Sequence, residues 1–348
     1  GRDGDPLKGA TPEVSPDLLM QLAMGGVVAQ ALAQVARYGI ADLLAEGPRS
    51  AEELAAQAKV NADALRRVLS CLEAYGIFAQ PQPGVFALLP LGKWLRSDRP
   101  DTLAPFVRMM TDDWQWRSFS RLDYSVGSGE SSFERMFGIP WFASLSLHPV
   151  ESEIFDRAMT VSALHHHRGA LAATDLSGVR SIVDVAGGKG ARLAAILQDH
   201  PGMKGVLFDQ PRVVEGAPKL FEDAGLAGRW SVVGGDLLSE LPAGYDAYLL
   251  ARVLHVWSEE RALRLLANVR RALPENGRLL LLETIVPEGA SPHSSRLLDL
   301  VMLTVCGSRE RTEREYVALL ARAGLEVTRV IPTQTMVSVI EAVRANTV

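Results

Sequence analysis

The chain has 348 residues, which exceeds a usual single core and favours two domains, one of them a large α/β unit. Its 47% hydrophobic content is ordinary for a globule, and its net charge of -5 argues against a nucleic-acid groove, because phosphate binding needs a basic face. The cysteines, Cys71 and Cys306, lie far apart without the spacing of a zinc site or disulfide framework, which favours a reducing, cytoplasmic location.

Neither a membrane span nor a targeting segment is expected from the sequence. Charged residues interrupt every apolar stretch well before the roughly 20 residues that a spanning helix requires. Residues 1–17 are polar and rich in proline and glycine, so we expect a flexible tail there.

Residues 18–100 have a helical pattern followed by a hairpin. Ser50 and Asn61 are expected N-caps of two helices, and Gly76 is expected to close the second one. Residues 78–90 then predict two short strands around a turn of proline and glycine. Helix, helix and hairpin in this order resemble a winged helix-turn-helix.

A winged helix would indicate DNA binding, which is the first alternative from a non-enzyme class. The stretch that would read DNA carries only Arg66 and Arg67 as cations, so packing is favoured over phosphate contact. Residues 18–36 are more apolar than one face of a monomer requires. We therefore expect this domain to form the interface of a homodimer.

Residues 101–178 are expected to be a mostly helical bridge that is dense in large side chains. Such residues suit a hydrophobic core, but they also suit the lining of a pocket for a flat aromatic ligand. The sequence leaves both readings open for the following residues: Trp114, Trp116, Phe119, Phe137, Trp141, Phe142, Phe155 and Met159.

From residue 179 onward, short strands alternate with helices, which predicts a mainly parallel sheet. The expected strands are 181–186, 204–209, 230–236, 246–254, 277–284 and 335–343. In an open α/β sheet the ligand lies outside the carboxyl ends of the strands. Five successive strands end on polar residues: Asp184, Asp209, Asp236, His255 and Glu283.

The first of these strands leads into the glycine-rich turn DVAGGKG at residues 184–190. As a dinucleotide fingerprint the turn is poor, since Leu193 stands where the third glycine belongs, and it lacks the spacing of a Walker loop. A ligand with a ribose but no phosphate fits better, with Asp209 accepting from both ribose hydroxyls. Asp184 either supports the turn or holds a ligand ammonium, and Asp236 either accepts from an adenine amino group or caps a helix.

The turn, with Ala186 in the first glycine position, and the stretches LFDQPRVV, VLHVWSEERALRLLANVRRALPENGRLLLLE and GSRERTEREYVALLARAGL resemble S-adenosylmethionine-dependent small-molecule O-methyltransferases. This family includes plant caffeic-acid-type enzymes and bacterial enzymes of anthracycline and mitomycin type. The resemblance covers nearly the whole chain. It implies a class I Rossmann-like α/β domain over 179–348, a helical bridge over 101–178 and a winged-helix-like dimerisation domain over 18–100.

The resemblance also implies roles for individual residues. His255 would be the general base of the Leu-His-Asp-Trp motif, with Glu283 and Glu310 orienting its ring. The cofactor, S-adenosyl-L-methionine, would contact Asp184, Gly187, Gly188, Gly190, Asp209, Gln210, Asp236, Leu237 and Trp257. The aromatic acceptor would contact Trp114, Trp116, Phe137, Trp141, Phe142, Phe155, Met159, Met302 and Cys306.

Three departures from the family pattern stand out. Val256 replaces the aspartate after the base, Ala251 replaces the cation four positions before it, and Cys306 stands where plant relatives have asparagine. No metal site is expected, because three consecutive histidines at 165–167 splay about 100° apart on a helix.

The expected function is methylation of a phenolic or enolic hydroxyl of an aromatic small molecule, in bacterial antibiotic biosynthesis. Two alternatives remain beside it. One is a hydroxylase of the same fold that binds the cofactor without methyl transfer, and the other is the disfavoured DNA-binding regulator. The expected partners are therefore the aromatic acceptor and a second copy of the chain, without nucleic acid or membrane.

Overall fold

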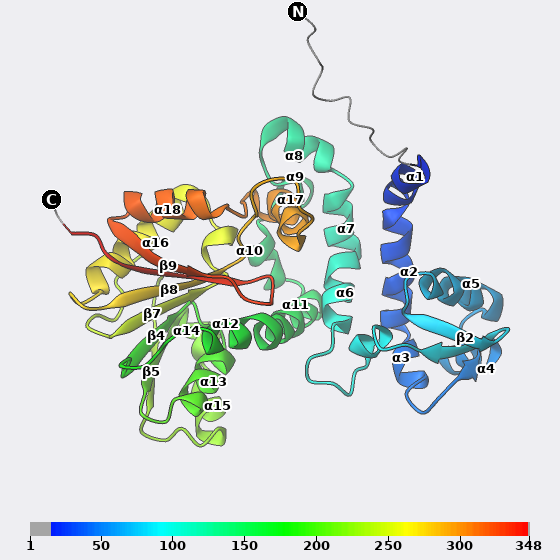
Figure 1. Ribbon diagram of the computed structural model, residues 1–348, viewed down its shortest axis with the longest axis horizontal. Coiled ribbons are helices and arrows are strands. Elements are labelled where there is room, and N and C mark those ends of the chain that lie inside the picture. Colours follow the sequence, from blue (N-terminus) through cyan, green and yellow to red (C-terminus); the bar gives the residue numbers. More distant parts are fainter. Residues whose placement is uncertain (1–14, 347–348) are drawn as a thin grey trace, which may run out of the picture. The chain divides into compact units, whose positions relative to one another are not determined.

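The computed structural model describes residues 15–346 and divides into two compact units, which meet in the chain between Asp112 and Asp113 (Figure 1). Most of the tail expected at residues 1–17 lies outside the described residues, and a helix begins at Asp17. Each unit has its own hydrophobic core.

The first unit consists of helices around a small antiparallel sheet in the order β1-β3-β2. Its elements are α1 (Asp17–Ala23), α2 (Gly25–Arg37), α3 (Ile40–Leu43), β1 (Arg49–Ser50), α4 (Ala51–Ala58), α5 (Ala62–Glu73), β2 (Phe78–Gln82), β3 (Val85–Leu88), the 3-10 helix η1 (Gly92–Leu95) and α6 (Ala104–Thr111). Strands β2 and β3 form the hairpin that the sequence predicts.

Side-chain caps fix the starts of α4 and α5. Ser50 accepts a hydrogen bond from Glu53 N–H at 3.1 Å, while Glu53 accepts from Ser50 N–H at 2.8 Å, which makes a capping box. Asn61 accepts from Ala64 N–H at 2.9 Å. Both predicted caps are therefore confirmed, and Gly76 follows α5 with a φ of +74°.

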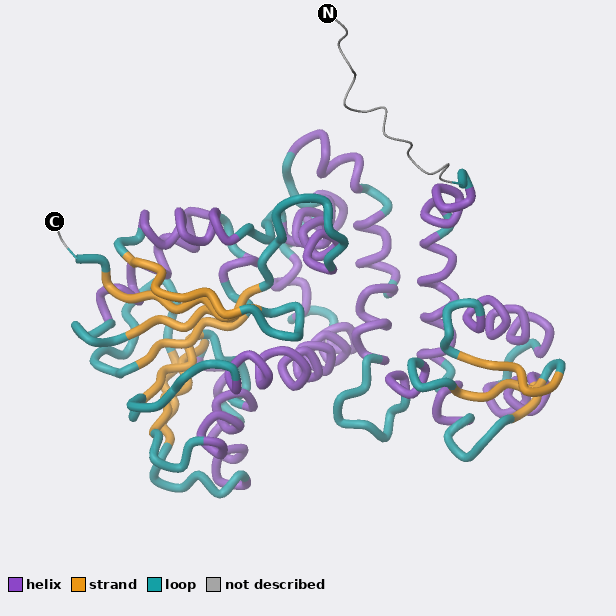
Figure 2. Tube along the Cα trace, viewed as in Figure 1, coloured by secondary structure: helices purple, strands orange, loops and turns teal. Residues whose placement is uncertain are grey.

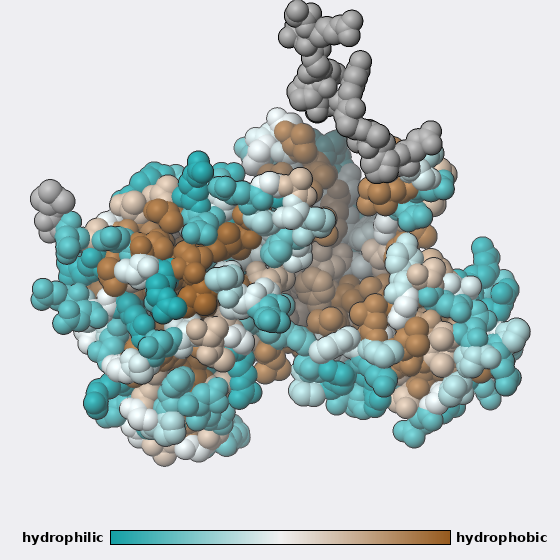
Figure 3. Space-filling model, viewed as in Figure 1, coloured by the Kyte–Doolittle hydropathy of each residue, from teal (hydrophilic) through white to brown (hydrophobic). Residues whose placement is uncertain are grey.

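Helix α1 and the start of α2 expose large apolar side chains, and hydrophobic surface is visible at the α1 end of this unit (Figure 3). More than half of the side-chain surface is exposed at Leu18, Leu19, Met20, Leu22, Met24 and Val27. Between residues 15 and 346, no single helix has the length and hydropathy to cross a membrane; only α1 and α2 together, bent by 52°, pass that test. Among residues 15–346, no side chain covers this apolar surface.

The second unit begins with helices and continues as an α/β domain. Its helices before the sheet are α7 (Asp113–Phe119), α8 (Leu122–Ser128), α9 (Ser132–Phe137), α10 (Trp141–Leu145), α11 (Pro149–Ser162), the π-helix η2 (Ala163–His167) and α12 (Arg168–Ala172). The later helices are α13 (Ala191–Asp199), α14 (Pro211–Val214), α15 (Ala217–Asp223), the 3-10 helix η3 (Leu254–Val256), α16 (Glu259–Ala272), α17 (Ser294–Cys306) and α18 (Glu313–Arg322).

Seven strands form one sheet in the order β6-β5-β4-β7-β8-β10-β9 (Figure 2). They are β4 (Ser181–Val185), β5 (Lys204–Asp209), β6 (Trp230–Gly234), β7 (Ala247–Ala251), β8 (Arg278–Glu283), β9 (Leu325–Ile331) and β10 (Ser338–Arg344). All pairs are parallel except those of β10, which runs antiparallel to β8 and β9. The six predicted strands are confirmed, and β9 is an additional one.

Helices cover both faces of the sheet. On one face α16 and α18 pack against it with Leu266 and Leu320, and on the other α13 and α15 do so with Leu193 and Phe221. The strand order reverses between β4 and β7, where successive crossovers leave toward opposite sides. Ligands of open α/β sheets bind in the crevice at such a switch point, so the ends of β4 and β7 frame the candidate site.

Candidate active site

The glycine turn after β4 is shaped for close approach by a ligand. A Cβ on Gly187 would lie 2.5 Å from Leu207 Cδ1 and 2.7 Å from Asp184 Cγ, so only glycine fits there. Gly188 has a φ of +63°, and a Cβ on it would meet nothing within 4 Å. Ala186 occupies the first glycine position with a φ of +58°, a conformation that costs a residue with a Cβ about 1–2 kcal/mol. The turn therefore presents backbone to open space.

Asp209, at the end of β5, holds this turn. Its carboxylate accepts from Gly188 N–H at 2.9 Å and from Gln210 N–H at 2.7 Å, and the side chain is half-buried. A carboxylate has about four lone-pair directions, so two remain for other donors. Two neighbouring hydroxyls, such as those of a ribose, match these two free acceptor directions.

Asp184 lies inside β4, beneath the turn, and is fully buried. It accepts from Arg192 Nη2 at 2.8 Å through Oδ1, while Oδ2 has no hydrogen-bond partner among the described residues. Burial raises the pKa of this carboxyl group, although the charge of Arg192 opposes the rise. Asp184 therefore supports the turn from below, and Oδ2 is its one unsatisfied oxygen.

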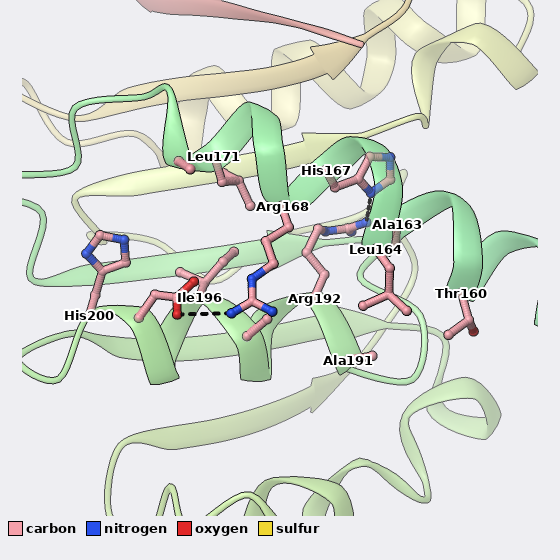
Figure 4. Close-up of a pocket in the computed structure, with 13 residues that line it drawn as sticks. Thr160, Ala163, Leu164, His167, Arg168, Leu171, Ala191, Arg192, Ile196 and His200 are labelled. Atoms are coloured by element: carbon pink, nitrogen blue, oxygen red, sulfur yellow. Dashed lines mark hydrogen bonds and ion pairs between the residues drawn. The ribbon is translucent and has the colours of Figure 1, made fainter. Parts of the chain in front are cut away.

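Arg192 links the turn to the π-helix η2, because its Nη1 lies 3.2 Å from His167 Nδ1 (Figure 4). Burial, followed by the charge of Arg192, lowers the pKa of His167 to about 2. His167 is therefore neutral at physiological pH, and its Nδ1 accepts from the guanidinium. π-helical turns are rare and occur frequently at functional sites.

The end of β6 carries the residues expected at the adenine. Asp236 is exposed and accepts from Leu238 N–H at 2.9 Å, while Leu237 is buried in the core. The alternative of a helix cap at Asp236 is wrong, since the residues after it form a turn without a helix. Trp257, after η3, is half-buried with the Arg261 guanidinium 4.9 Å from its ring centroid.

His255 lies in the short helix η3 after β7 and is 7% exposed. Its Nδ1 is 3.0 Å from Oε1 of Glu310, which follows α17. Glu283, the last residue of β8, accepts from Leu254 N–H at 3.1 Å rather than from the ring. The structure thus brings both acids to η3, but only Glu310 contacts the imidazole.

Arg252 joins the two acids and was missed by the sequence argument, which looked for a cation at Ala251. Its Nη1 lies 3.0 Å from Glu283 Oε2 and 3.1 Å from Glu310 Oε2, and its Nη2 lies 2.7 Å from Glu310 Oε1. The side chain is 14% exposed. The cation comes from three positions before His255 instead of four.

The charges of this cluster decide which nitrogen of His255 is basic. Burial disfavours the ionised form of Glu310, but the charge of Arg252 and the bond to His255 lower its pKa to about 2. Burial raises the pKa of Glu283, although both of its oxygens face N–H donors, which favour a carboxylate. An ionised Glu310 accepts a hydrogen bond from Nδ1–H, which keeps the ring proton on Nδ1 and leaves Nε2 as the basic nitrogen.

Several aromatic side chains expected at the acceptor pack against one another. Trp114 lies 4.8 Å from Trp141 and 5.4 Å from Phe133 between ring centroids, and Phe137 lies 4.7 Å from Phe133. Phe155 adds an edge contact with Trp141 at 6.0 Å. These rings come from α7, α9, α10 and α11 and form a small core against α17.

The remaining expected acceptor contacts differ in exposure. Phe142 and Met159 expose 46% and 38% of their surface, whereas Trp116 is half-buried beside Phe119. Met302 and Cys306 lie on α17, and burial raises the pKa of the Cys306 thiol to about 12. Cys306 is therefore a neutral thiol and a weak hydrogen-bond donor in the described structure.

A cavity of about 330 Å³ lies between the segment η2–α12 and helix α13 (Figure 4). Its lining is mostly apolar and includes Leu164, His167, Arg192 and Ile196. Neither Asp209 nor His255 lines it, so it is separate from the strand-end crevice. Within residues 15–346, no group of three or more His, Cys, Asp or Glu side chains has the arrangement of a metal site.

The chain matches the O-methyltransferase dimerisation domain over residues 20–98 and the O-methyltransferase domain over residues 119–326. It is 38% identical to the phenazine O-methyltransferase PhzM of Lysobacter antibioticus, over 96% of this chain and 97% of that protein. The structure of CalO1, a methyltransferase in calicheamicin biosynthesis solved with bound S-adenosylhomocysteine, is similar with a TM-score of 0.87 and 37% identity, over 99% of this chain and 100% of that one.

A third relative was solved with both a methyl donor and an aromatic ligand. This is the O-methyltransferase NcsB1 from neocarzinostatin biosynthesis, in complex with S-adenosylmethionine and 2-hydroxy-5-methyl naphthoic acid. It is similar with a TM-score of 0.78 and 31% identity, over 96% of this chain and 100% of that one. The chain belongs to this family and is an S-adenosylmethionine-dependent O-methyltransferase.

Proposed function

We propose that the enzyme methylates a phenolic or enolic hydroxyl of an aromatic small molecule in bacterial natural-product biosynthesis, with His255 as general base. The observation that carries this proposal is the 3.0 Å contact between His255 Nδ1 and Glu310, which leaves Nε2 as the basic nitrogen at the switch point of the sheet. The names of the relatives support the class of product.

The residues at the glycine turn are suited to hold S-adenosylmethionine. Asp209 would accept from the ribose hydroxyls, the glycine turn at Gly188 would hold the methionine part, and Asp236 with Leu237 would hold the adenine. Bound there, the cofactor supplies an electrophilic methyl group on its sulfonium sulfur. Holding the acceptor oxygen in line with that methyl at near-attack distance accounts for a large part of the acceleration.

His255 supplies the nucleophile at neutral pH. A phenol has a pKa near 10, so about one molecule in a thousand is ionised at pH 7. His255 Nε2 takes the hydroxyl proton while the oxygen accepts the methyl group, and Glu310 stabilises the imidazolium that forms. General-base assistance of this kind contributes about 10² to 10⁴ in rate.

The acceptor lies beside Met159 and Met302, where the thioether side chains adapt to a flat ring. Phe142 and Cys306 border this region, whereas Trp114, Phe137, Trp141 and Phe155 support it from their own packed cluster. The naphthoic acid in the NcsB1 complex supports a flat, hydroxylated acceptor.

The second partner is another copy of this chain, docked through the apolar side chains of α1 and α2. The match to a dimerisation domain over residues 20–98 supports this homodimer, and so does the exposure of Leu19 and Leu22. Exposed apolar patches of this kind mark interfaces.

A direct test uses S-adenosylmethionine with a deuterated methyl group and a panel of hydroxylated phenazines, naphthoates and quinones. We expect mass spectrometry to find the labelled methyl on an aromatic or enolic oxygen, together with stoichiometric S-adenosylhomocysteine. Label on nitrogen would refute the hydroxyl acceptor. Oxygen insertion with the methyl donor unconsumed would refute methyl transfer and support the hydroxylase alternative.

A further inference from the structure

Arg252 is held in an unusual backbone conformation between β7 and η3. Its φ is +56°, which is rare for a residue with a Cβ, and its N–H donates to Leu282 O at 2.9 Å. Strained residues of this kind persist where surrounding contacts compensate, and they cluster at functional sites. Here the compensating contacts are the ion pairs with Glu283 and Glu310.

We propose that Arg252 is a positioning residue, whose charge offsets one of the two carboxylate charges of Glu283 and Glu310 so that His255 rests neutral, with its proton on Nδ1 and Nε2 free. This inference rests on the proposed function, in which His255 takes the acceptor proton. One cation against two carboxylates leaves a single uncompensated negative charge. The imidazolium neutralises that charge when it forms. Before the reaction, the neutral ring gives Glu310 a hydrogen bond from Nδ1–H.

Other ionisable groups face this cluster from each neighbouring element. Asp299 on α17 accepts from Glu310 N–H at 2.8 Å, and Arg311 donates to Leu254 O at 3.4 Å. Tyr316 on α18 and the η2 residues His166 and His167 lie within electrostatic range of Arg252. Among the cations of residues 15–346, Arg252 is the arginine or lysine that forms ion pairs with Glu283 and Glu310.

Removal of the guanidinium would leave the two buried carboxylates of Glu283 and Glu310 without the cation that pairs with both. Two buried carboxylates that share one site do not both stay ionised without a counter-charge. The cluster of Glu283, Glu310 and His255 therefore takes up a proton. Histidine has the ordinary pKa closest to neutrality among these groups, so its ring becomes the site of uptake. A protonated ring cannot take the hydroxyl proton from the aromatic substrate.

The first test is the pH dependence of kcat/KM for Arg252→Met. We expect its acid limb to move to higher pH by about one to two units, because the loss of a neighbouring positive charge raises the pKa of a histidine ring by about that much. For a limb that starts near the ordinary histidine pKa, activity at pH 7 would fall about threefold to 25-fold and would recover by about pH 9. Arg252→Lys keeps the charge, so its limb stays within about half a unit of that of the unaltered enzyme.

The control is Arg278→Met, which breaks an ion pair with Glu341 at 3.6 Å in the same unit but away from the site. It tests whether loss of an arginine alone moves the limb, and we expect no movement. Thermal unfolding of all variants checks that they are folded at the assay temperature.

The double variant Arg252→Met/Glu283→Gln removes one cation and one carboxylate together. The charge balance is restored, so we expect the acid limb to return toward that of the unaltered enzyme. If Arg252 had a purely structural role, the second substitution would lower kcat further without moving the limb back. That result would overturn the inference.

A second readout needs no methyl transfer. Side-chain NMR of histidine rings labelled with ¹³C and ¹⁵N, assigned with His255→Asn, reports the protonation of His255 in the enzyme without substrate. We expect a neutral ring with its proton on Nδ1 at pH 7.5, and a protonated ring in Arg252→Met. An unchanged ring titration overturns the inference, whereas a changed titration with a fully active His255→Asn enzyme supports it and refutes only the general-base proposal.

Discussion

Replacement of His255 by asparagine is expected to lower kcat by about 10² to 10⁴ while changing the affinity for S-adenosylmethionine by less than about threefold. The asparagine amide can still donate to Glu310, so the carboxylate keeps a partner, but no group remains that takes a proton at neutral pH. The loss should shrink as the pH rises toward the pKa of the acceptor phenol, because the nucleophile then forms without a base. Single-turnover rates and calorimetric titration separate the two effects.

The matched control for this variant is His200→Asn. His200 follows the last residue of α13 and borders the cavity of Figure 4, and its carbonyl accepts from Arg229 Nη1 at 3.1 Å. We expect its kcat to be unaltered. If His255→Asn also kept full turnover at pH 7, proximity of the reactants would be the whole mechanism and His255 would be only a buried ring.

Replacement of Asp209 by alanine is expected to raise the dissociation constant for S-adenosylhomocysteine about tenfold to several hundredfold. In the proposed site the carboxylate offers the ribose hydroxyls charge-assisted acceptors, each contributing about 1.5–3 kcal/mol, and it also accepts from Gly188 N–H, which fixes the turn. Loss of Asp209 therefore removes a ligand contact and loosens the backbone that faces the ligand. Isothermal titration with the product measures the effect without a known acceptor.

Asp223→Ala serves as the comparison, since Asp223 pairs with Lys219 on the exposed side of α15 and should leave affinity unaltered. Asp209→Asn is expected to be intermediate, because an amide oxygen accepts from one hydroxyl but carries no charge. Equal affinity in Asp209→Ala and the unaltered enzyme would place the ribose elsewhere.

The positions of the parallel strands along the chain, and their ends, could be predicted because apolar runs such as Leu279–Leu282 are bounded by turn residues and by polar strand ends. The strand β9 was missed for an equally physical reason. Its sequence, LEVTRVI, alternates buried and exposed positions at the edge of the sheet, so Glu326 and Arg329 interrupt the apolar pattern. An edge strand of this kind forms because it pairs with its neighbour β10, and its own composition does not predict it.

The site was predictable to the extent that it depends on strand ends. Asp209, His255 and Glu283 arrive at one edge because parallel strands end together. Arg252 was not predictable from spacing, because its left-handed φ turns the side chain toward two acids that lie 31 and 58 residues away in the chain. The number of residues between a cation and His255 does not predict such a backbone conformation, and so does not predict where the side chain points.

Burial explains the other differences between expectation and structure. Asp184 looks like a strand-end ligand group in sequence, yet it lies within β4 and pairs with Arg192, a contact that needs the first turn of α13 to pack over the strand. The aromatic residues of the bridge likewise could not be divided into core and pocket from composition. The structure divides them by exposure: Trp141 is buried in the packed cluster, whereas Phe142 is exposed at its margin and makes an edge contact with Phe155, at 5.9 Å between ring centroids.

The central claim is that the adenosyl group lies across the carboxyl edge of the sheet, with its sulfur directed toward His255. A crystal structure of the enzyme with S-adenosylhomocysteine tests this most directly. The account predicts ribose hydroxyls within hydrogen-bond distance of the Asp209 carboxylate, and the sulfur on the side of the crevice where His255 Nε2 opens. S-adenosylhomocysteine bound in the cavity between η2 and α13, with Asp209 free of it, would contradict the account.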